Sequence, residues 1–215
     1  MIKELLIQYN KGGVFMHFIL ITSFIGLAIA IERFIVLWAA AKINKEDLLK
    51  HINNNILQGN LQGALSTTSQ INNPLTNIIR AGIAAVANRG TPEEVQTAMD
   101  AVALREVPRL EKRIGLLATL SNIATLLGLL GTVVGLIGAF AAVANVAPAE
   151  KATMLSNAIA TAMNTTAFGL IVAIPLLGAF GYLNNMVQGI VDDMHESSVA
   201  TLNFILTHKD KLMRK

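Results

Sequence analysis

The sequence lacks cysteine altogether and has few charged residues. With no cysteine among 215 residues, disulfide bonds and thiolate metal sites are excluded. Charged residues make up only 14% of the chain, whereas a soluble domain has about 25%. The net charge of +3 is scattered, without a dense basic run that carries interleaved aromatics, so it does not indicate a nucleic-acid partner.

Catalytic signatures are also missing. No nucleophile, metal-binding or phosphate-cradle motif occurs, so enzyme activity is not expected. The histidines show no ligand-like spacing and are interpreted as surface or interface residues: His17, His51, His195 and His208. No metal or bound cofactor is predicted.

What the chain does have is long apolar runs. No residue between Arg113 and Glu150 is charged, and none between Lys151 and Asp192. A third apolar stretch runs from about Val14 to Ile31. Apolar runs beyond about 18 residues are typical of membrane spans, because about 20 helical residues are needed to cross the hydrocarbon core. Three such runs in one small chain predict an integral membrane protein.

The predicted fold class is all-α, with three transmembrane helices. At 1.5 Å per residue a helix of about 35 residues reaches roughly 50 Å, so the second and third should extend into a cytoplasmic helical bundle. The predicted segments are 1–13 (short, extracytoplasmic), 14–38 (first span), 39–113 (cytoplasmic helical region), 114–147 (second span), 148–152 (extracytoplasmic loop), 153–191 (third span) and 192–215 (cytoplasmic tail).

Lysine and arginine counts predict the orientation. Two lie before the first span, nine between Lys42 and Arg113, one at Lys151, and four in the tail. Because cytoplasmic segments carry the excess of positive charge, the N-terminus is expected outside and the C-terminus in the cytoplasm. A cleaved signal peptide is the alternative for the first span, but Glu32 and Arg33 separate the apolar stretch from the small residues of a cleavage-like pattern.

Short motifs predict where the helices of the cytoplasmic region begin and end. "TPEE" at 91–94 has a capping threonine, a first-turn proline and a glutamate that completes a capping box. "NNP" at 72–74 and "NRG" at 88–90 are typical of turns.

Glycines form a stripe along the second span. Gly128, Gly131, Gly135 and Gly138 are spaced by 3, 4 and 3 residues, which places them on one helical face. Small residues let helices approach closely in lipid, so a packing face is the simplest interpretation.

Hydroxyls accompany this stripe. Thr125 and Thr132 are seven residues apart, and Thr161, Thr165 and Thr166 follow in the third span. A lone threonine usually bonds its own helix, but a cluster in two adjacent spans predicts a hydrated or ligand-contacting face.

Neither long span contains Asp, Glu, His, Lys or Arg. Proton relays through membranes usually need one. Glu32 is interpreted as forming an interfacial ion pair with Arg33, at the end of the first span. If the chain moves ions, either a partner supplies the ionisable carrier or the path consists of water and hydroxyls alone.

Three blocks resemble the MotA/TolQ/ExbB proton-channel family, and specifically its three-span TolQ/ExbB branch. They are "KGGVFMHFILITSFIGLAIAIERFIVL", "LATLSNIATLLGLLGTVVGLIGAF" and "IATAMNTTAFGLIVAIP". The resemblance is weakest over residues 42–90. The flagellar branch is similar but usually has four spans and a longer chain.

The resemblance implies a homopentamer in the bacterial inner membrane, around two copies of a single-span ExbD/TolR-like protein that supplies an aspartate. Proton flow would then drive mechanical work on the cell envelope, and a TonB-like or other envelope protein is a further candidate partner. Thr132 and Thr166 match the family's pore threonines, and Thr165 matches a more variable one. Thr125 stands where members often have proline, which bears on helix geometry and on ion choice; H+ is favoured and Na+ stays open.

Other functions are compatible with the residues alone. One is a non-conducting helical scaffold whose glycines only pack, and another is a stator subunit of the flagellar or gliding type. A carrier of small solutes is less favoured, because three spans without inverted repeats or broken helices do not match that class.

Overall fold

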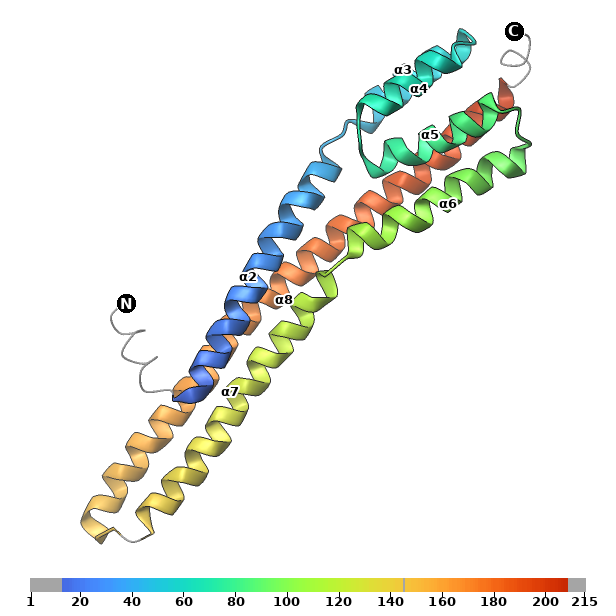
Figure 1. The fold of residues 1–215 in the computed structure, drawn as a ribbon. Helices are drawn as coiled ribbons and strands as arrows, with labels where there is room; N and C mark the ends of the chain where they lie inside the picture. Colours follow the sequence, from blue (N-terminus) through green and yellow to red (C-terminus); the bar gives the residue numbers. More distant parts are fainter. Residues whose placement is uncertain (1–12, 145, 209–215) are drawn as a thin grey trace. The chain divides into compact units, whose positions relative to one another are not determined.

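The computed structural model describes residues 13–144 and 146–208, and the regular structure in these residues is entirely helical. The helices in chain order (Figure 1) are α2 (Val14–Ala41), α3 (Lys45–Leu57), α4 (Leu61–Gln70), α5 (Pro74–Ala87), α6 (Pro92–Glu111), α7 (Ile114–Val143) and α8 (Pro148–Thr207). The all-α prediction is confirmed. Most of the predicted N-terminal segment and the last seven residues of the predicted tail lie outside the described residues.

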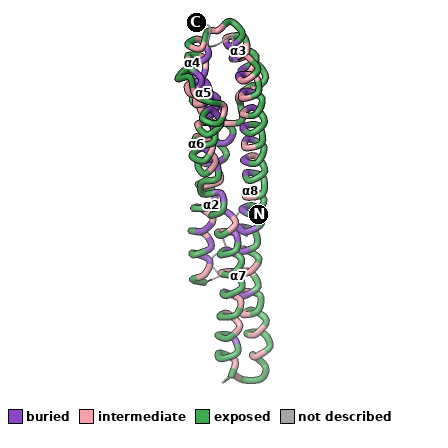
Figure 2. Tube along the Cα trace, turned by 90° about the vertical axis from the view of Figure 1, so that its right-hand side faces the viewer, coloured by how far each residue is buried: buried purple, intermediate pink, exposed green. Residues whose placement is uncertain are grey.

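Three helical stretches are long and apolar enough to cross a membrane, as predicted. They lie in α2, in the α6–α7 stretch and in α8, where the most apolar windows have mean hydropathies of 2.4, 2.3 and 1.9. Only 22%, 17% and 28% of these windows is buried within the chain, and Figure 2 shows exposed residues along α7 and the adjoining part of α8. Apolar side chains that the chain itself does not cover need lipid or another protein around them.

The observed helix bounds differ from the predicted segments around the third span. Residues 148–152, predicted as a loop, form the first turn of α8. Pro148 suits a helix start, because the backbone N–H that proline lacks would have no intrahelical acceptor at this position. The helix then continues unbroken for 60 residues to Thr207, past the predicted end of the span at residue 191.

The chain divides into two compact units. The first comprises Met1–Arg33 and Arg113–Tyr182, and it therefore contains most of α2, all of α7 and the first part of α8. Within it α7 and α8 are consecutive helices that run side by side in opposite directions (Figure 1). Gly26 of α2 faces Leu176 of α8, where an added Cβ would lie 2.6 Å from the leucine side chain.

The second unit comprises Phe34–Lys112 and Leu183–Lys215 and contains α3 to α6. Its interior consists of large apolar side chains at helical spacing, among them Ile52, Ile56, Ile78, Ile79, Ile83, Met99, Leu183 and Met194.

Polar contacts fix the ends of the helices in this second unit. Asn73 Nδ2 donates to the Ala40 carbonyl at 2.8 Å, and Lys45 Nζ lies 2.6 Å from Asp193 Oδ1 and 2.8 Å from Glu196 Oε2. These two carboxylates raise the pKa of Lys45 above its usual range.

The predicted helix starts and turns of this unit are confirmed. Thr91 accepts a hydrogen bond from Glu94 N at 3.2 Å, and Glu94 Oε2 accepts one from Thr91 N at 2.7 Å, which completes a capping box. A second box at Asn73 and Thr76 starts α5 just after "NN". At "NRG" the chain turns with Arg89 at φ 61°.

We expect Thr91→Ala to destabilise the start of α6, because it leaves the Glu94 amide without its capping acceptor. Loss of such a cap costs about 1 kcal/mol, so amide hydrogens in the first turn should exchange roughly fivefold faster. Thr97→Ala is the control, since the Thr97 hydroxyl only bonds the Glu93 carbonyl of its own helix. Equal exchange rates in the two variants would contradict the capping role.

Candidate functional site

The two long helices of the first unit meet through glycine. A Cβ added to Gly169 of α8 would lie 2.7 Å from the Ala124 carbonyl oxygen and 3.1 Å from Gly128 Cα. A Cβ on Gly128 of α7 would lie 3.2 Å from the Thr165 oxygen and from Thr166 Cα. The backbones therefore approach closely here, as small residues allow in membrane helices.

The other glycines of the stripe contribute unequally. Gly131 faces the methyl group of Thr165, and Gly135 faces Ala162, whose Cβ would lie 3.2 Å from an added Cβ. Gly138 is exposed and has open space around it, so the described residues do not supply the packing partner predicted for it. Gly169, which faces Gly128, lies outside the predicted stripe. Its position four residues after Thr165 places both on one face of the third span, and this spacing could have identified it.

Thr132 and Thr166 come together beside this crossing. The two hydroxyls are hydrogen-bonded to each other. Thr132 Oγ1 also lies 3.2 Å from the carbonyl oxygens of Gly128 and Ala162, and Thr166 Oγ1 lies 3.0 Å from that of Gly128. Thr132, Thr166 and these two carbonyls form what we call the threonine cluster. It joins α7 to α8 through polar atoms in an otherwise apolar stretch.

Of the other predicted threonines, Thr125 and Thr161 bond within their own helices. Thr125, which is exposed, bonds the Ser121 carbonyl at 3.1 Å, and Thr161 bonds that of Asn157 at 3.0 Å. Thr165 is 2% exposed and packs its methyl group against Gly131. Position along the helix, rather than residue type, therefore decides which hydroxyls lie at the crossing.

Ser121 was not predicted as part of the site. Its hydroxyl donates across the helix pair to the Ala173 carbonyl at 2.7 Å, and the side chain is 3% exposed. Ser121 precedes Gly128 by seven residues, so both lie on the same face of α7. This bond adds a second polar connection between α7 and α8.

Glu32 and Arg33, the predicted pair, lie 3.0 Å apart from Oε1 to Nη2. Arg113, at the junction of α6 and α7, joins them, because its Nη1 lies 2.8 Å from Glu32 Oε2. Arg113 has φ 65°, a left-handed conformation that is uncommon for a residue with a side chain. Glu32 thus links the end of the apolar part of α2 to the start of α7.

The chemistry available at the threonine cluster is limited to hydroxyls and carbonyls. Residues 114–143 and 152–191 contain no Asp, Glu, His, Lys or Arg. Among the residues that the structure describes, no group of three or more His, Asp or Glu could hold a metal ion. The cluster can accept or relay hydrogen bonds and can solvate a cation or an acid from elsewhere.

Three helical stretches long and apolar enough to cross a membrane, two of which are joined by a polar crossing without charged residues, indicate a multi-pass helical membrane protein. Residues 70–196 match the model of the MotA/TolQ/ExbB proton channel family, and the chain belongs to this family. The matched region includes all of α7 and the threonine cluster.

A similar protein comes from Methanothermobacter thermautotrophicus and carries the name of a biopolymer transport protein ExbB homolog. It is 29% identical over 187 residues, which cover 86% of this chain. The chain spans 64% of the length of that relative.

We expect Gly169→Ala to destabilise the pairing of α7 and α8, because the added methyl meets backbone atoms that cannot move without separating the helices. Overpacking of this kind costs about 1–3 kcal/mol and should lower the melting temperature of the detergent-solubilised chain. Gly138→Ala is the matched control, since it gains helix propensity and meets open space within the chain. If the two variants melt at the same temperature, the close crossing is contradicted.

Proposed function

We propose that this chain is the channel subunit of an ion-driven membrane motor, and that the threonine cluster lines its ion path. The observation that carries the proposal is the meeting of the Thr132 and Thr166 hydroxyls between residues 114–143 and 152–191, two stretches that contain no Asp, Glu, His, Lys or Arg. Both hydroxyls are only partly buried within the chain, so a polar group from another chain can reach them. Family membership supports the same function.

The proposal needs an acid from another chain. The family resemblance favours a pentamer in the bacterial inner membrane around two single-span ExbD/TolR-like helices, each with one aspartate. That aspartate would gain and lose a proton beside Thr132 and Thr166, and the hydroxyl dipoles would solvate it. Proton flow from outside to inside would drive movement of one component within the other, with the N-terminus of this chain outside. The biopolymer transport in the relative's name favours work on the cell envelope.

A non-conducting scaffold is the second candidate function. The close approach at Gly128 and Gly169 favours it, because packing alone could explain these two glycines. The two functions differ in what the hydroxyls do, since a scaffold needs only the helix pairing.

We expect Thr132→Val, which keeps the side-chain shape, to abolish proton flux through the complex. Interhelical hydrogen bonds in membranes contribute only about 0.6 kcal/mol on average, so the oligomer should still assemble. Flux would be measured with a pH-sensitive dye in proteoliposomes that contain the chain and its partner, under an imposed potential.

Thr119→Val is the matched control on the same helix. The Thr119 side chain is exposed and only bonds the Gly115 carbonyl of its own helix at 3.2 Å. Full flux in the Thr132→Val variant, with assembly intact, would refute the ion path and favour the scaffold.

The native mass of the detergent-extracted chain tests the assembly. We expect five times the 23.0 kDa of one chain, and an increase of two partner copies on co-expression with a single-span, aspartate-containing protein encoded beside it. A monomer or dimer that ignores such a partner would remove the pore, and the glycines would then serve helix packing alone.

A further inference from the structure

The second unit contains an open cleft that the ion path does not use. It has a volume of about 590 Å³ and lies among α4, α5 and α6. Volumes of roughly 300–1,000 Å³ are usual for small-molecule sites. Its polar lining is Asn77 and Arg80 from α5, together with Arg105, Glu106 and Arg109 from α6.

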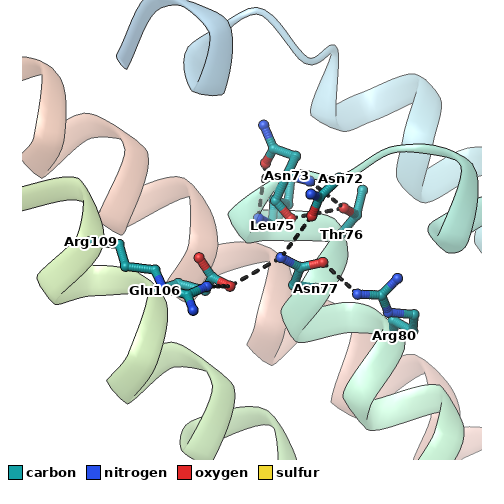
Figure 3. A network of polar contacts seen from close by, with 8 residues as sticks. All are labelled: Asn72, Asn73, Leu75, Thr76, Asn77, Arg80, Glu106 and Arg109. Carbon is teal, nitrogen blue, oxygen red and sulfur yellow. Dashed lines mark hydrogen bonds and ion pairs between the residues drawn. The ribbon is translucent and has the colours of Figure 1, made fainter. Parts of the chain in front are cut away.

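The lining residues hold one another in place. Arg80 Nη2 donates to Asn77 Oδ1 at 2.6 Å, and Asn77 Nδ2 donates to Glu106 Oε1 at 3.1 Å (Figure 3). The same carboxylate oxygen lies 3.2 Å from Arg109 Nη1. Glu106 is 8% exposed, so one buried carboxylate contacts both Asn77 and Arg109, and Asn77 in turn contacts Arg80.

The cleft keeps an excess of positive charge. The lining contains three arginines and one glutamate, which leaves two positive charges without a balancing anion in the lining. Arg105 is exposed and makes no hydrogen bond or ion pair with any residue in the described part of the chain. Arg105 and Arg109 are four residues apart on one helix, where like charges repel. An anion bound between the arginines would relieve this repulsion.

The chemistry of the cleft favours phosphate over a single carboxylate. A phosphate group carries up to two negative charges and three acceptor oxygens, which match the excess charge and the forked donors of guanidinium groups. The rest of the lining is apolar, namely Leu65, Ala81, Ala84 and Val102, and can hold an uncharged part of the same ligand. We propose that this cleft binds a phosphate-bearing anion through Arg80, Arg105 and Arg109.

The test measures binding to the full chain purified in detergent. In one arm, calorimetry follows inorganic pyrophosphate as a soluble probe. In the other arm, native mass spectrometry compares retention of phosphatidylglycerol with that of zwitterionic phosphatidylcholine. Arg105→Gln is the first variant, because Arg105 makes no described contact whose loss would affect folding. Arg89→Gln is the matched control. It removes one positive charge, as Arg105→Gln does, but Arg89 is exposed and lies outside the cleft.

We expect Arg105→Gln to weaken binding about tenfold, the effect of one charged hydrogen bond, while Arg89→Gln binds as the unchanged chain does. Arg80→Gln should weaken it similarly, because it removes a positioned guanidinium. Arginine-dependent binding of pyrophosphate would support the site with a soluble ligand, and arginine-dependent retention of phosphatidylglycerol alone would support it with a lipid ligand. The proposal would be overturned if neither probe binds. It would also be overturned if Arg105→Gln and Arg89→Gln weaken binding equally.

Discussion

The close approach of two backbones at Gly128 and Gly169 is the constraint on which the rest of the first unit depends. In lipid the hydrophobic effect does not drive helices together, so association relies on van der Waals contact and on polar bonds between helices. Without side chains at these two positions the helix axes can come close. A threonine side chain on one helix is then long enough to reach carbonyl oxygens of the other, as Thr132 reaches Ala162 at 3.2 Å. The threonine cluster and the Ser121 bond are both consequences of this short distance.

The second unit is built on different principles, although the same chain forms both. Helices α3 to α6 begin at side-chain caps, which at α5 and α6 are capping boxes, and their apolar faces pack around a common interior. Exposed lysine and carboxylate pairs, such as Lys45 with Asp193, are solvated and contribute little to stability. Polar groups near the interior are organised instead by the nearly buried Glu106. Threonine shows the contrast, because it caps a helix at Thr91 in this unit and joins two helices at Thr132 in the other.

The sequence predicts the elements of this structure well and their facing surfaces less well. Apolar run length and capping motifs are local properties, so the three candidate spans and the start of α6 followed directly from the residues. The spacing of Gly128, Gly131 and Gly135 places them on one face of α7, where a Cβ added to each would lie within 3.2 Å of an atom of α8. Spacing on one helix cannot tell how the neighbouring helix is rotated or shifted along it, however. The roles of Gly169, of Ser121 and of the exposed Gly138 depend on that shift.

The hydrogen bonds of the threonine cluster also determine what it can offer to a third group. Each hydroxyl has one proton, and the nearby acceptors are the Gly128 and Ala162 carbonyls and the other hydroxyl. When both protons are directed to these acceptors, the cluster presents only oxygen lone pairs outward. Lone pairs attract a protonated carboxyl group or a metal cation and repel a carboxylate. Under the proposed function, the partner's acid would therefore be held at the cluster more readily in its neutral form than in its charged form.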